Sequence, residues 1–410
     1  MTLTYTPSAP DVRANPYPQF SELRERDPVH WSPALKSWVL TRYDDVARAL
    51  ATADEMSPDR LTPFYATLAE PGRSILAEVM RYLSLWIVFR DPPGHTRVRA
   101  LVSKAFLPGT ITGWRPVIDE ISERLIDDLA KKGPCETDLV ADLTMQLPAR
   151  VIMRIMDVPE QHLADIKHWS DDIMTFLFSA RDITDKYERA RRGAGAMAAL
   201  FRQLIEERRA APGNDLLSLL ITARDQDDKL SEDELVATAM LLLFAGHETT
   251  TNLLSNSTLM LLRDPEARDR FVAEPDSAGT SIEEFLRFDG PSNSMSRVVR
   301  ADHEVGGKRL KQGDRVFAMI NAANRDPRQF EMPDRLDLGR QPNRHLTFGQ
   351  GAHFCVGAQL ARLEARIALP RLFQRFPDLA VGSAPPVWHD SLIARGLESL
   401  PVRTGRSLDV

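Results

Sequence analysis

The chain has 410 residues, of which 43% are hydrophobic, and this is enough apolar material to bury a large core in a globular protein. Its 52 lysines and arginines against 58 aspartates and glutamates give a net charge of −6, which argues against nucleic acid as the main partner. Two cysteines, Cys135 and Cys355, exclude a disulfide framework and favour a reducing compartment.

The termini and the absence of linkers bear on location and domain number. The first twenty residues contain no apolar signal-peptide region, and the most apolar helical run, Ala237–Gly246, is shorter than the ~18 residues that a membrane span needs. No repeat and no Gly/Ser-rich or Pro-rich linker interrupts the sequence. We therefore expect a cytoplasmic monomer without a membrane anchor, in which residues 1–410 form a single domain. Cys135 is expected in a surface loop.

The N-terminal part of the chain is expected to form strands. Alternating apolar and polar residues predict a β-ribbon over Val29–Tyr43, within a β-rich portion of about residues 29–60, and YDDVARALA follows as a short helix. Residues from about 92 to 290 are predicted to form a helical core. Within it, Trp114–Gly133 has apolar residues at steps of three and four and ends in Lys-Lys-Gly, a typical helix C-terminus.

The sequence pattern changes after Arg297, where short apolar stretches separated by turns predict strands. A last long helix is expected from Ala358 to about Phe376. Together the patterns predict a mainly α-helical fold with small β-sheets, of the α+β class.

Cys355 lies in a glycine-rich segment, FGQGAHFCVG, that directly precedes this last helix. A free thiol is mostly protonated at neutral pH, so a metal-binding or nucleophilic role requires something that stabilises the thiolate. The glycines let backbone N–H groups approach the sulfur, and the N-terminus of the following helix favours an anion. No second cysteine or HExxH pattern completes a zinc site, so a single thiolate suggests a metal bound in a cofactor, such as haem iron.

Three other interpretations of this cysteine remain open from these residues alone. A lone cysteine is often an inert, buried apolar residue, and a glycine-rich loop before a helix can bind phosphate instead. A nucleophilic cysteine with His353 as its base is the third, although the sequence offers no third group to orient the histidine.

The segment Phe348–Gly357 resembles the haem-binding signature of the cytochrome P450 family, F-x-x-G-x-x-x-C-x-G, and matches it at every fixed position. Further family motifs recur in the family's order across most of the chain. The resemblance implies a cytochrome P450 fold, with haem b between a distal and a proximal helix and a haem-thiolate loop at residues 348–357. It implies that Cys355 is the iron ligand and that the cofactor contacts in the loop are Phe348, Gly349, Cys355, Val356 and Gly357.

LLLFAGHETTTNLL, residues 241–254, resembles the family's oxygen-binding helix, A-G-x-[DE]-T. By that resemblance Ala245 and Gly246 contact the cofactor, and Gly246 leaves room for a diatomic ligand. The hydroxyl of Thr249 can bond the carbonyl one turn back, and Glu248 adds a titratable group beside it. Thr249 and Glu248 are therefore the candidate catalytic residues, in a proton relay to dioxygen. Taken alone, the segment is equally compatible with a buried helix whose Thr and Glu face solvent.

Two sets of charged residues match supporting parts of the family pattern. Glu284 and Arg287 resemble E-x-x-R, which pairs with a later arginine, here Arg335 or Arg340, in a structural role. The haem propionates are expected to bind cationic side chains. The candidates at family-like positions are His95 and Arg99, one helical turn apart, together with Arg297 and His345.

The resemblance implies a haem-thiolate monooxygenase that activates dioxygen and inserts one oxygen atom, by hydroxylation or epoxidation. The chain lacks GxGxxG and CxxC patterns, so electrons from NAD(P)H are expected through a separate ferredoxin and ferredoxin reductase. Arg362 and Arg366 either receive such an acidic partner or are ordinary solvated charges. The alternatives are a haem-thiolate peroxygenase and a non-enzymatic haem-based gas sensor or carrier, and the Glu248–Thr249 pair counts against both.

A hydrophobic small molecule is the expected substrate, because the residues placed around the pocket are largely apolar. The candidate substrate contacts are Leu241, Phe244, Ala245, Asn293, Met295 and Ile393. Residues 62–86 are expected to form an access lid, and residues 174–179 its other rim. The sequence does not choose among a terpenoid, a steroid, a fatty acid and a macrolide-like compound.

Overall fold

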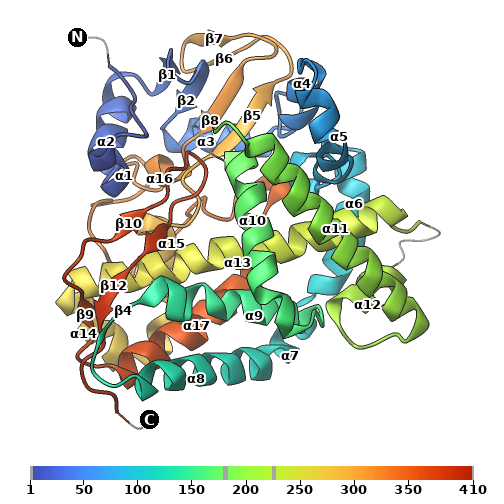
Figure 1. Ribbon diagram of the computed structural model, residues 1–410. Coiled ribbons are helices and arrows are strands. Elements are labelled where there is room, and N and C mark those ends of the chain that lie inside the picture. The colour runs from blue at the N-terminus through green and yellow to red at the C-terminus, as the bar shows by residue number, and fades with distance from the viewer. Residues whose placement is uncertain (1–2, 179–182, 224–227, 409–410) are drawn as a thin grey trace.

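A central helix, α13 (Glu232–Arg263), organises the computed structural model, which describes residues 3–178, 183–223 and 228–408 (Figure 1). It begins with a capping box, in which Ser231 accepts a hydrogen bond from the backbone N–H of Glu234 and the Glu234 side chain accepts one from the N–H of Ser231. Nearly all of its residues up to Leu261 are buried, on every side of the helix, as its central position requires.

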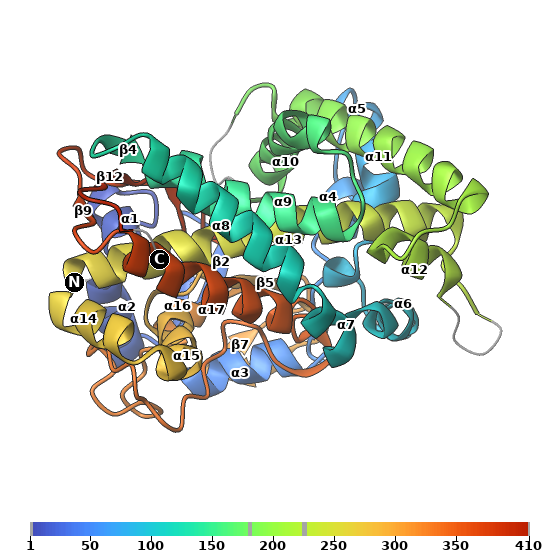
Figure 2. The ribbon, with the colours of Figure 1, turned by 90° about the horizontal axis from the view of Figure 1, so that it is seen from below.

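Helices surround α13 on two sides (Figures 1 and 2). On one side α10 packs against α11, and α11 packs against α5 and α13. On the other side α13 contacts α9, α15 and α17, and α8 lies along α17. The bounds of these helices are α5 (Gly72–Leu83), α8 (Arg115–Lys131), α9 (Gln146–Ile155), α10 (Leu163–Phe178), α11 (Lys186–Ala210), α15 (Ala278–Asp289) and α17 (Ala358–Arg375).

The main sheet joins the N-terminal ribbon to strands from late in the chain, at the top of Figure 1. Its order is β1-β2-β8-β5-β3; β1 pairs antiparallel with β2, and β2 pairs parallel with β8. The strands are β1 (Val29–Ser32), β2 (Ser37–Leu40), β3 (Met56–Ser57), β5 (Met295–Val299) and β8 (Arg315–Ala318). Smaller sheets pair β6 (His303–Val305) with β7 (Lys308–Leu310), β10 (Val387–Trp388) with β11 (Leu397–Ser399), and β12 (Pro401–Arg403) with both β4 (Glu136–Asp138) and β9 (Ala380–Val381).

Short helices complete the fold. They are α1 (Pro10–Ala14), α2 (Tyr17–Arg26), α3 (Tyr43–Ala51), α4 (Leu61–Ala66), η1 (Ile87–Phe89), α6 (Gly94–Ser103), η2 (Lys104–Phe106), α7 (Pro108–Gly113), η3 (Val140–Thr144, a π-helical turn), η4 (Glu160–His162), α12 (Leu216–Thr222), α14 (Pro265–Ala273), η5 (Pro275–Ser277), α16 (Ile320–Ala323) and η6 (Gly351–His353).

The predicted class, mainly α with small sheets, is confirmed. The ribbon forms as β1 and β2, YDDVARALA forms α3, and the last long helix begins at Ala358 as expected. One hydrophobic cluster draws side chains from Leu61 to Val402 and so ties early helices to the last strand. Cys135 lies in a loop before β4, but it is half-buried, and its N–H donates to Thr404 Oγ1. Among the helices of the described residues, none is both long and apolar enough to cross a membrane.

Candidate active site

The loop before α17 is held in a tight turn by two glycines. Gly349 and Gly351 have φ angles of +73° and +68°, which side chains rarely tolerate, and a Cβ on Gly351 would also lie 3.1 Å from Ala51 Cα. The N–H of Cys355 donates to the carbonyl of Phe348 at 2.8 Å and closes the loop. Gly357 differs from the prediction: its φ is −85°, and a Cβ there would meet open space, so the turn itself does not require glycine at this position.

The sulfur of Cys355 lies at the N-terminus of α17, as predicted. Burial raises the pKa of its thiol, while hydrogen bonds from the N–H groups of Gly357 and Ala358 and the nearby guanidinium of Arg99 lower that pKa. Cys355 keeps accessible surface although protein surrounds it densely, as expected of a side chain that lines an internal space.

A network of bonded side chains from α15 and α17 supports the loop. Arg362 of α17 lies over the ring of Phe348, with the guanidinium carbon 4.3 Å from the ring centroid, and donates to both carboxylate oxygens of Glu283 at 2.6 and 2.8 Å. Burial would raise the pKa of Glu283, but Arg362 and His345 outweigh it and lower that pKa to about 2. Arg362 is therefore not an ordinary solvated charge but part of an internal brace, and its contact with an acidic partner stays a prediction. Arg366 is exposed.

His345 belongs to this brace and not to the propionate-binding group in which the sequence placed it. Its Nε2 lies 3.1 Å from Glu283, and its Nδ1 accepts the N–H of Thr347. Both ring nitrogens are thus committed to the chain's own polar groups. The prediction failed because a histidine near a cysteine loop has no sequence signal that separates a brace from a ligand contact.

The E-x-x-R pair is fully buried and forms the centre of a larger network. Arg287 donates to both oxygens of Glu284 at 2.8 Å, and Arg340 lies 3.2 Å from the same carboxylate. Of the two predicted partners, Arg340 joins the pair with its side chain, whereas Arg335 contributes a backbone carbonyl to Arg287. The structural role that the sequence assigned to these residues matches this arrangement.

Four basic side chains gather beside the cysteine loop without a carboxylate bonded to them in the described part of the chain. They come from α6, β5 and η6, and are His95, Arg99, Arg297 and His353. The rings of His95 and His353 lie 4.0 Å apart, and burial together with the three positive neighbours lowers the pKa of His353 to about 3. Burial also lowers the pKa of Arg297 to about 10.

Buried nitrogen atoms in this basic group lack hydrogen-bond partners. Both ring nitrogens of His95 and Nε2 of His353 are enclosed and unbonded within the described residues. Unpaired buried polar atoms are costly, so the group is complementary to a ligand that carries negative charge. His353 was considered in the sequence only as a base for a nucleophile, and its position two residues before Cys355 was the signal for a ligand contact.

On α13, one polar face opens towards an interior space. Thr249 is exposed although His247, Glu248 and Thr250 around it are buried, and its Oγ1 donates to the carbonyl of Ala245 at 3.0 Å, as predicted. Gly246 has a packing role that the sequence did not predict, because a Cβ there would lie 2.9 Å from Cγ1 of Ile152; its contact with the cofactor stays a prediction. This glycine permits the close approach of α9 to α13.

Glu248 is buried beside two basic groups. Its Oε1 lies 3.1 Å from His247 Nε2 and 3.4 Å from the ammonium of Lys167, which also bonds Asp171. Burial would raise the pKa of Glu248, but His247 and Lys167 outweigh it and lower that pKa to about 2. The carboxylate is therefore anionic at neutral pH, next to the accessible hydroxyl of Thr249.

An aromatic cluster lies against the same helix. Phe244 packs against Trp86 and Phe178, with ring centroids 5.3 and 6.2 Å apart, and Trp86 stacks on Phe89. Of the predicted substrate contacts, Phe244 belongs to this cluster, Leu241 is buried on the same helix, and Ala245 is half-buried. Trp86, Phe89 and Phe178 were not predicted individually, although the expected lid and rim contained Trp86 and Phe178; Ser179 of that rim lies outside the described residues.

The other three predicted substrate contacts pack elsewhere. The side-chain amide of Asn293 donates to the carbonyl of Leu392, and Ile393 packs against an N-terminal cluster that includes Tyr5. Met295 packs against the core beneath the main sheet. None of these contacts is with the aromatic cluster.

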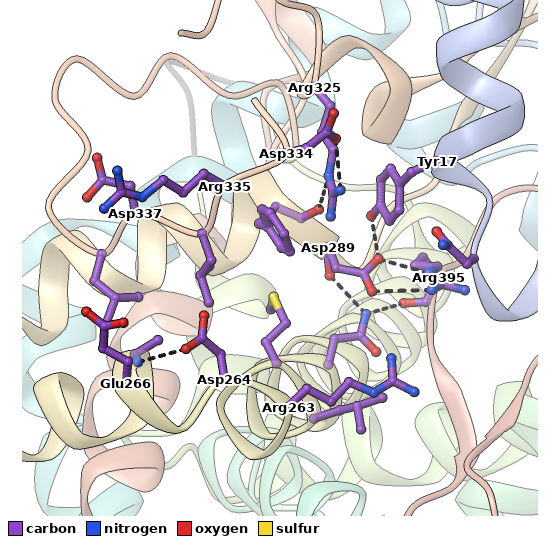
Figure 3. Close-up of a pocket in the computed structure, with 18 of the residues that line it drawn as sticks. Tyr17, Arg263, Asp264, Glu266, Asp289, Arg325, Asp334, Arg335, Asp337 and Arg395 are labelled. Atoms are coloured by element: carbon purple, nitrogen blue, oxygen red, sulfur yellow. Dashed lines mark hydrogen bonds and ion pairs between the residues drawn. The ribbon is translucent and has the colours of Figure 1, made fainter. Parts of the chain in front are cut away.

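A polar pocket of about 540 Å³ lies at the far end of α13 and is separate from this site (Figure 3). Its charged groups are largely paired with one another: Asp289 accepts from Tyr17 and Arg395 at 2.5 and 2.9 Å, and Arg325 lies 3.1 Å from Asp334. Its lining includes no residue of the cysteine loop, the basic group or the aromatic cluster. This pocket is therefore not part of the site that contains Cys355.

The family model described as Cytochrome P450 matches residues 37–381, which is most of the chain. The chain is a cytochrome P450. It is similar to a vitamin D(3) 25-hydroxylase of Pseudonocardia autotrophica, with 38% identity over 95% of this chain and 94% of that protein. It is also similar to the cytochrome P450 monooxygenase PikC of Streptomyces venezuelae, with 35% identity over 97% of this chain and 92% of that protein.

Solved structures agree with this assignment. P450BioI, determined in complex with an acyl carrier protein ligated to hexadec-9Z-enoic acid, superimposes with a TM-score of 0.88 at 34% identity, over 97% of this chain and 100% of that one. The cytochrome P450 fold is thus confirmed, and the chain is an oxidoreductase that incorporates oxygen.

Membership of the family implies a haem cofactor, and the residues present fit one. A thiol held at a helix N-terminus suits an axial iron ligand. Beside it, the unbonded nitrogens of His95 and His353 and the two arginines suit the pair of propionate carboxylates.

Proposed function

We propose that this cytochrome P450 is a haem-thiolate monooxygenase that inserts one oxygen atom from dioxygen into an apolar small molecule. Bound haem would supply the activation of dioxygen at its iron. The observation that carries the proposal is a combination of three features: the braced cysteine loop, a basic group to which no carboxylate of the described residues is bonded, and the Glu248–Thr249 pair on α13.

Each part of the chain then has one task. Cys355 would ligate the iron as thiolate, and the N–H groups of Gly357 and Ala358 would moderate its charge. His95, Arg99, Arg297 and His353 would bind the propionates. The stack of Arg362 on Phe348 would hold the loop in place.

Glu248 and Thr249 would deliver protons. The hydroxyl of Thr249 is accessible and is held by the carbonyl of Ala245, so it is oriented to donate and accept at one position. Glu248 is anionic beside Lys167, whose side chain is 31% exposed and therefore reaches towards solvent. Protons can pass from solvent to the carboxylate and then to the threonine hydroxyl.

Two electrons per turnover would come from NAD(P)H through a ferredoxin and its reductase. The chain contains no flavin, nicotinamide or iron–sulfur motif, and the exposed Arg366 of α17 offers a cation to an acidic partner. The aromatic cluster around Phe244 would hold the substrate's apolar part.

The cofactor assignment is tested by the ferrous–CO spectrum. A strongly red-shifted Soret band is expected for the wild type and its loss is expected for Cys355→Ala, because only a thiolate ligand produces that shift. A wild-type protein that binds haem without the shifted band would overturn the thiolate assignment.

The monooxygenase assignment is tested by coupling, the ratio of oxygenated product to NADH consumed with ferredoxin and reductase. Thr249→Ala is expected to lower this ratio and to raise peroxide release. Thr258→Ala is the matched control, since Thr258 makes the same bond to the carbonyl four residues back but is buried further along α13. Product formed with peroxide only would identify a peroxygenase, and CO binding without any product would identify a sensor or carrier.

A further inference from the structure

Arg60, at the start of α4, points its guanidinium into the aromatic cluster. The guanidinium carbon lies 5.2 Å from the ring centroid of Phe89 and 5.7 Å from that of Phe178. These rings connect to α13, because Phe178 packs on Phe244. Arg60 therefore lies at the outer end of an apolar row that leads to the helix carrying Thr249.

No carboxylate pairs with this arginine among the described residues. One N–H of Arg60 donates to the carbonyl of Leu177 at 2.9 Å, and that is its one hydrogen bond to them. The charged group that lies close enough to affect it is another cation, Arg315. Its other N–H groups have no acceptor among the described residues, and the side chain is only half-buried.

Most other enclosed arginines of the described residues are bonded to a carboxylate, unlike Arg60. Arg287, Arg362 and Arg395 are each bonded to a carboxylate of the chain. Arg99 and Arg297 lack such a bond, and they belong to the basic group that suits the haem propionates. Arg24 is buried and also bonds no carboxylate, but Asp326 and Asp334 lie near it and offset its charge. Arg60 has no such acid near it among the described residues, so its charge is available to a negatively charged ligand.

A second unpaired donor lies in the same cluster. Trp86 is 1% exposed, and its ring stacks on that of Phe89, which also contacts Arg60, with an angle of 8° between the ring planes. The indole N–H of Trp86 has no acceptor among the described residues. A buried indole N–H normally finds a partner. The indole N–H of Trp86 and the remaining N–H groups of Arg60, which have no acceptor among the described residues, thus border one apolar region.

We propose that Arg60 binds the carboxylate of an amphiphilic substrate, a long-chain carboxylic acid whose apolar body lies along the aromatic cluster towards α13. The inference rests on the proposed function and narrows its substrate class. Arg60 is then a specificity-determining residue: it fixes one end of the molecule and so selects which carbon lies near Thr249. A guanidinium forms two parallel hydrogen bonds to a carboxylate, which a neutral head group cannot match.

A purely structural role makes a different prediction. Arginine near a helix C-terminus can bond the last carbonyls, and the bond to Leu177 at the end of α10 is of this kind. If that were its whole task, removing the guanidinium would weaken the binding of charged and neutral ligands alike.

The test compares dodecanoate with dodecan-1-ol on the holoenzyme, by isothermal titration calorimetry and by the spin-state shift of the Soret band. The wild type is expected to bind dodecanoate at least tenfold more tightly than the alcohol. Arg60→Gln should lose about ten- to a hundredfold in affinity for dodecanoate and little for dodecan-1-ol, as expected for a charged hydrogen bond. Arg60→Lys should retain part of the preference.

Arg73→Gln is the matched control, because Arg73 also lies over an aromatic ring, that of Tyr65 at 5.7 Å, but is exposed. It should leave both affinities unchanged. Equal losses for acid and alcohol in Arg60→Gln, or a wild type that does not prefer the acid, would overturn the proposal. Should Arg60→Gln fail to fold, the wild-type preference and the lysine variant still decide.

The outcome is separable from that of the proposed function. If monooxygenation fails, calorimetry still reports whether Arg60 selects the carboxylate. If the carboxylate preference fails while the red-shifted CO band and coupled turnover of a neutral substrate persist, the enzyme assignment stands and the substrate class is wrong.

Discussion

The two sides of the cysteine loop and α13 treat arginine in opposite ways. We call the network around Glu283 and Glu284 the braced side, and each of its arginines bonds a carboxylate. Arg287 and Arg340 bond the buried Glu284, and Arg362 bonds the half-buried Glu283. On the side of the aromatic cluster, Arg60 is enclosed without any acid among the described residues. On the braced side the arginines are neutralised by carboxylates of the protein itself, whereas the charge of Arg60 is available to a ligand.

This contrast has a physical basis. An iron ligand must keep one position through every cycle, so a network in which every charge is satisfied and packed is favourable there. A binding pocket gains selectivity when its donors are fully paired only after the correct ligand enters. Unpaired donors are therefore tolerated in the pocket, at a cost to stability, and not in the brace.

The largest effect is expected from breaking the brace at its most buried point. Glu284→Gln leaves Arg287 enclosed without a counter-charge and should destabilise the protein by about 3–5 kcal/mol. The loss should appear as a lower urea midpoint and as a lower ratio of Soret to protein absorbance, because the loop that ligates haem relaxes.

Glu274→Gln is the control for that change, since it removes an exposed pair with Arg270 that is about half accessible on both partners. It should cost less than about 1 kcal/mol. Equal costs for the two variants would mean that the brace stabilises the fold no more than a surface pair does.

A second test concerns a carboxylate that is paired with arginines outside the braced side. Glu234, at the start of α13, is bonded by Arg90 and Arg97; burial would raise its pKa, but the arginines and the N–H of Ser231 lower it from the ordinary 4.5 to about 2. Because the folded-state pKa is depressed, the stabilisation is complete above pH ~5 and is lost as the pH falls towards 2.

Glu234→Gln should therefore lower the free energy of unfolding at pH 7 by about 1–3 kcal/mol, because each pKa unit corresponds to about 1.36 kcal/mol and solvent around the arginines screens part of the interaction. The difference from wild type should shrink as the pH falls from 5 to 3, measured by urea unfolding. Glu232→Gln, at an exposed position on the same helical turn, should show neither effect. A difference that is constant with pH would exclude the carboxylate's charge as its cause.

The sequence predicted the fold and the braced loop well, for local reasons. Alternation gave β1 and β2, helical periodicity gave α8 and α17, and the spacing around Cys355 located the loop. These signals act over a few residues, so tertiary packing did not have to be known.

The sequence failed where a residue's role depends on distant partners. His345 and Arg362 were read as ligand and surface residues, but Glu283, some 60 to 80 positions away, bonds both. Arg60 carried no motif, and its significance comes from the absence of a described acid around it and from rings of two other segments. Such information exists only once the chain has folded.

A smaller effect is expected from Gly246, where α13 packs closely against α9. Because a Cβ would lie 2.9 Å from Ile152, Gly246→Ala should destabilise the fold by about 1–3 kcal/mol through overpacking. Ile152→Val in the same protein should recover part of that loss, as measured by urea unfolding. If Gly246→Ala leaves stability unchanged but slows CO binding, the glycine instead serves ligand access.

The smallest effect is expected at the exposed edge of the braced side. Arg366 lies on α17 near Gly279 of α15, and it is exposed, unlike Arg362 one turn earlier. If an acidic ferredoxin docks there, Arg366→Glu should raise the KM for reduced ferredoxin about three- to tenfold at low ionic strength, because a favourable charge becomes a repulsive one. The effect should fade in 0.5 M salt, and the CO spectrum should not change. Arg73→Glu, an equivalent charge reversal at an exposed position of α5, should leave that KM unchanged. The same rise in both variants would show that net charge, and not this face, governs electron delivery.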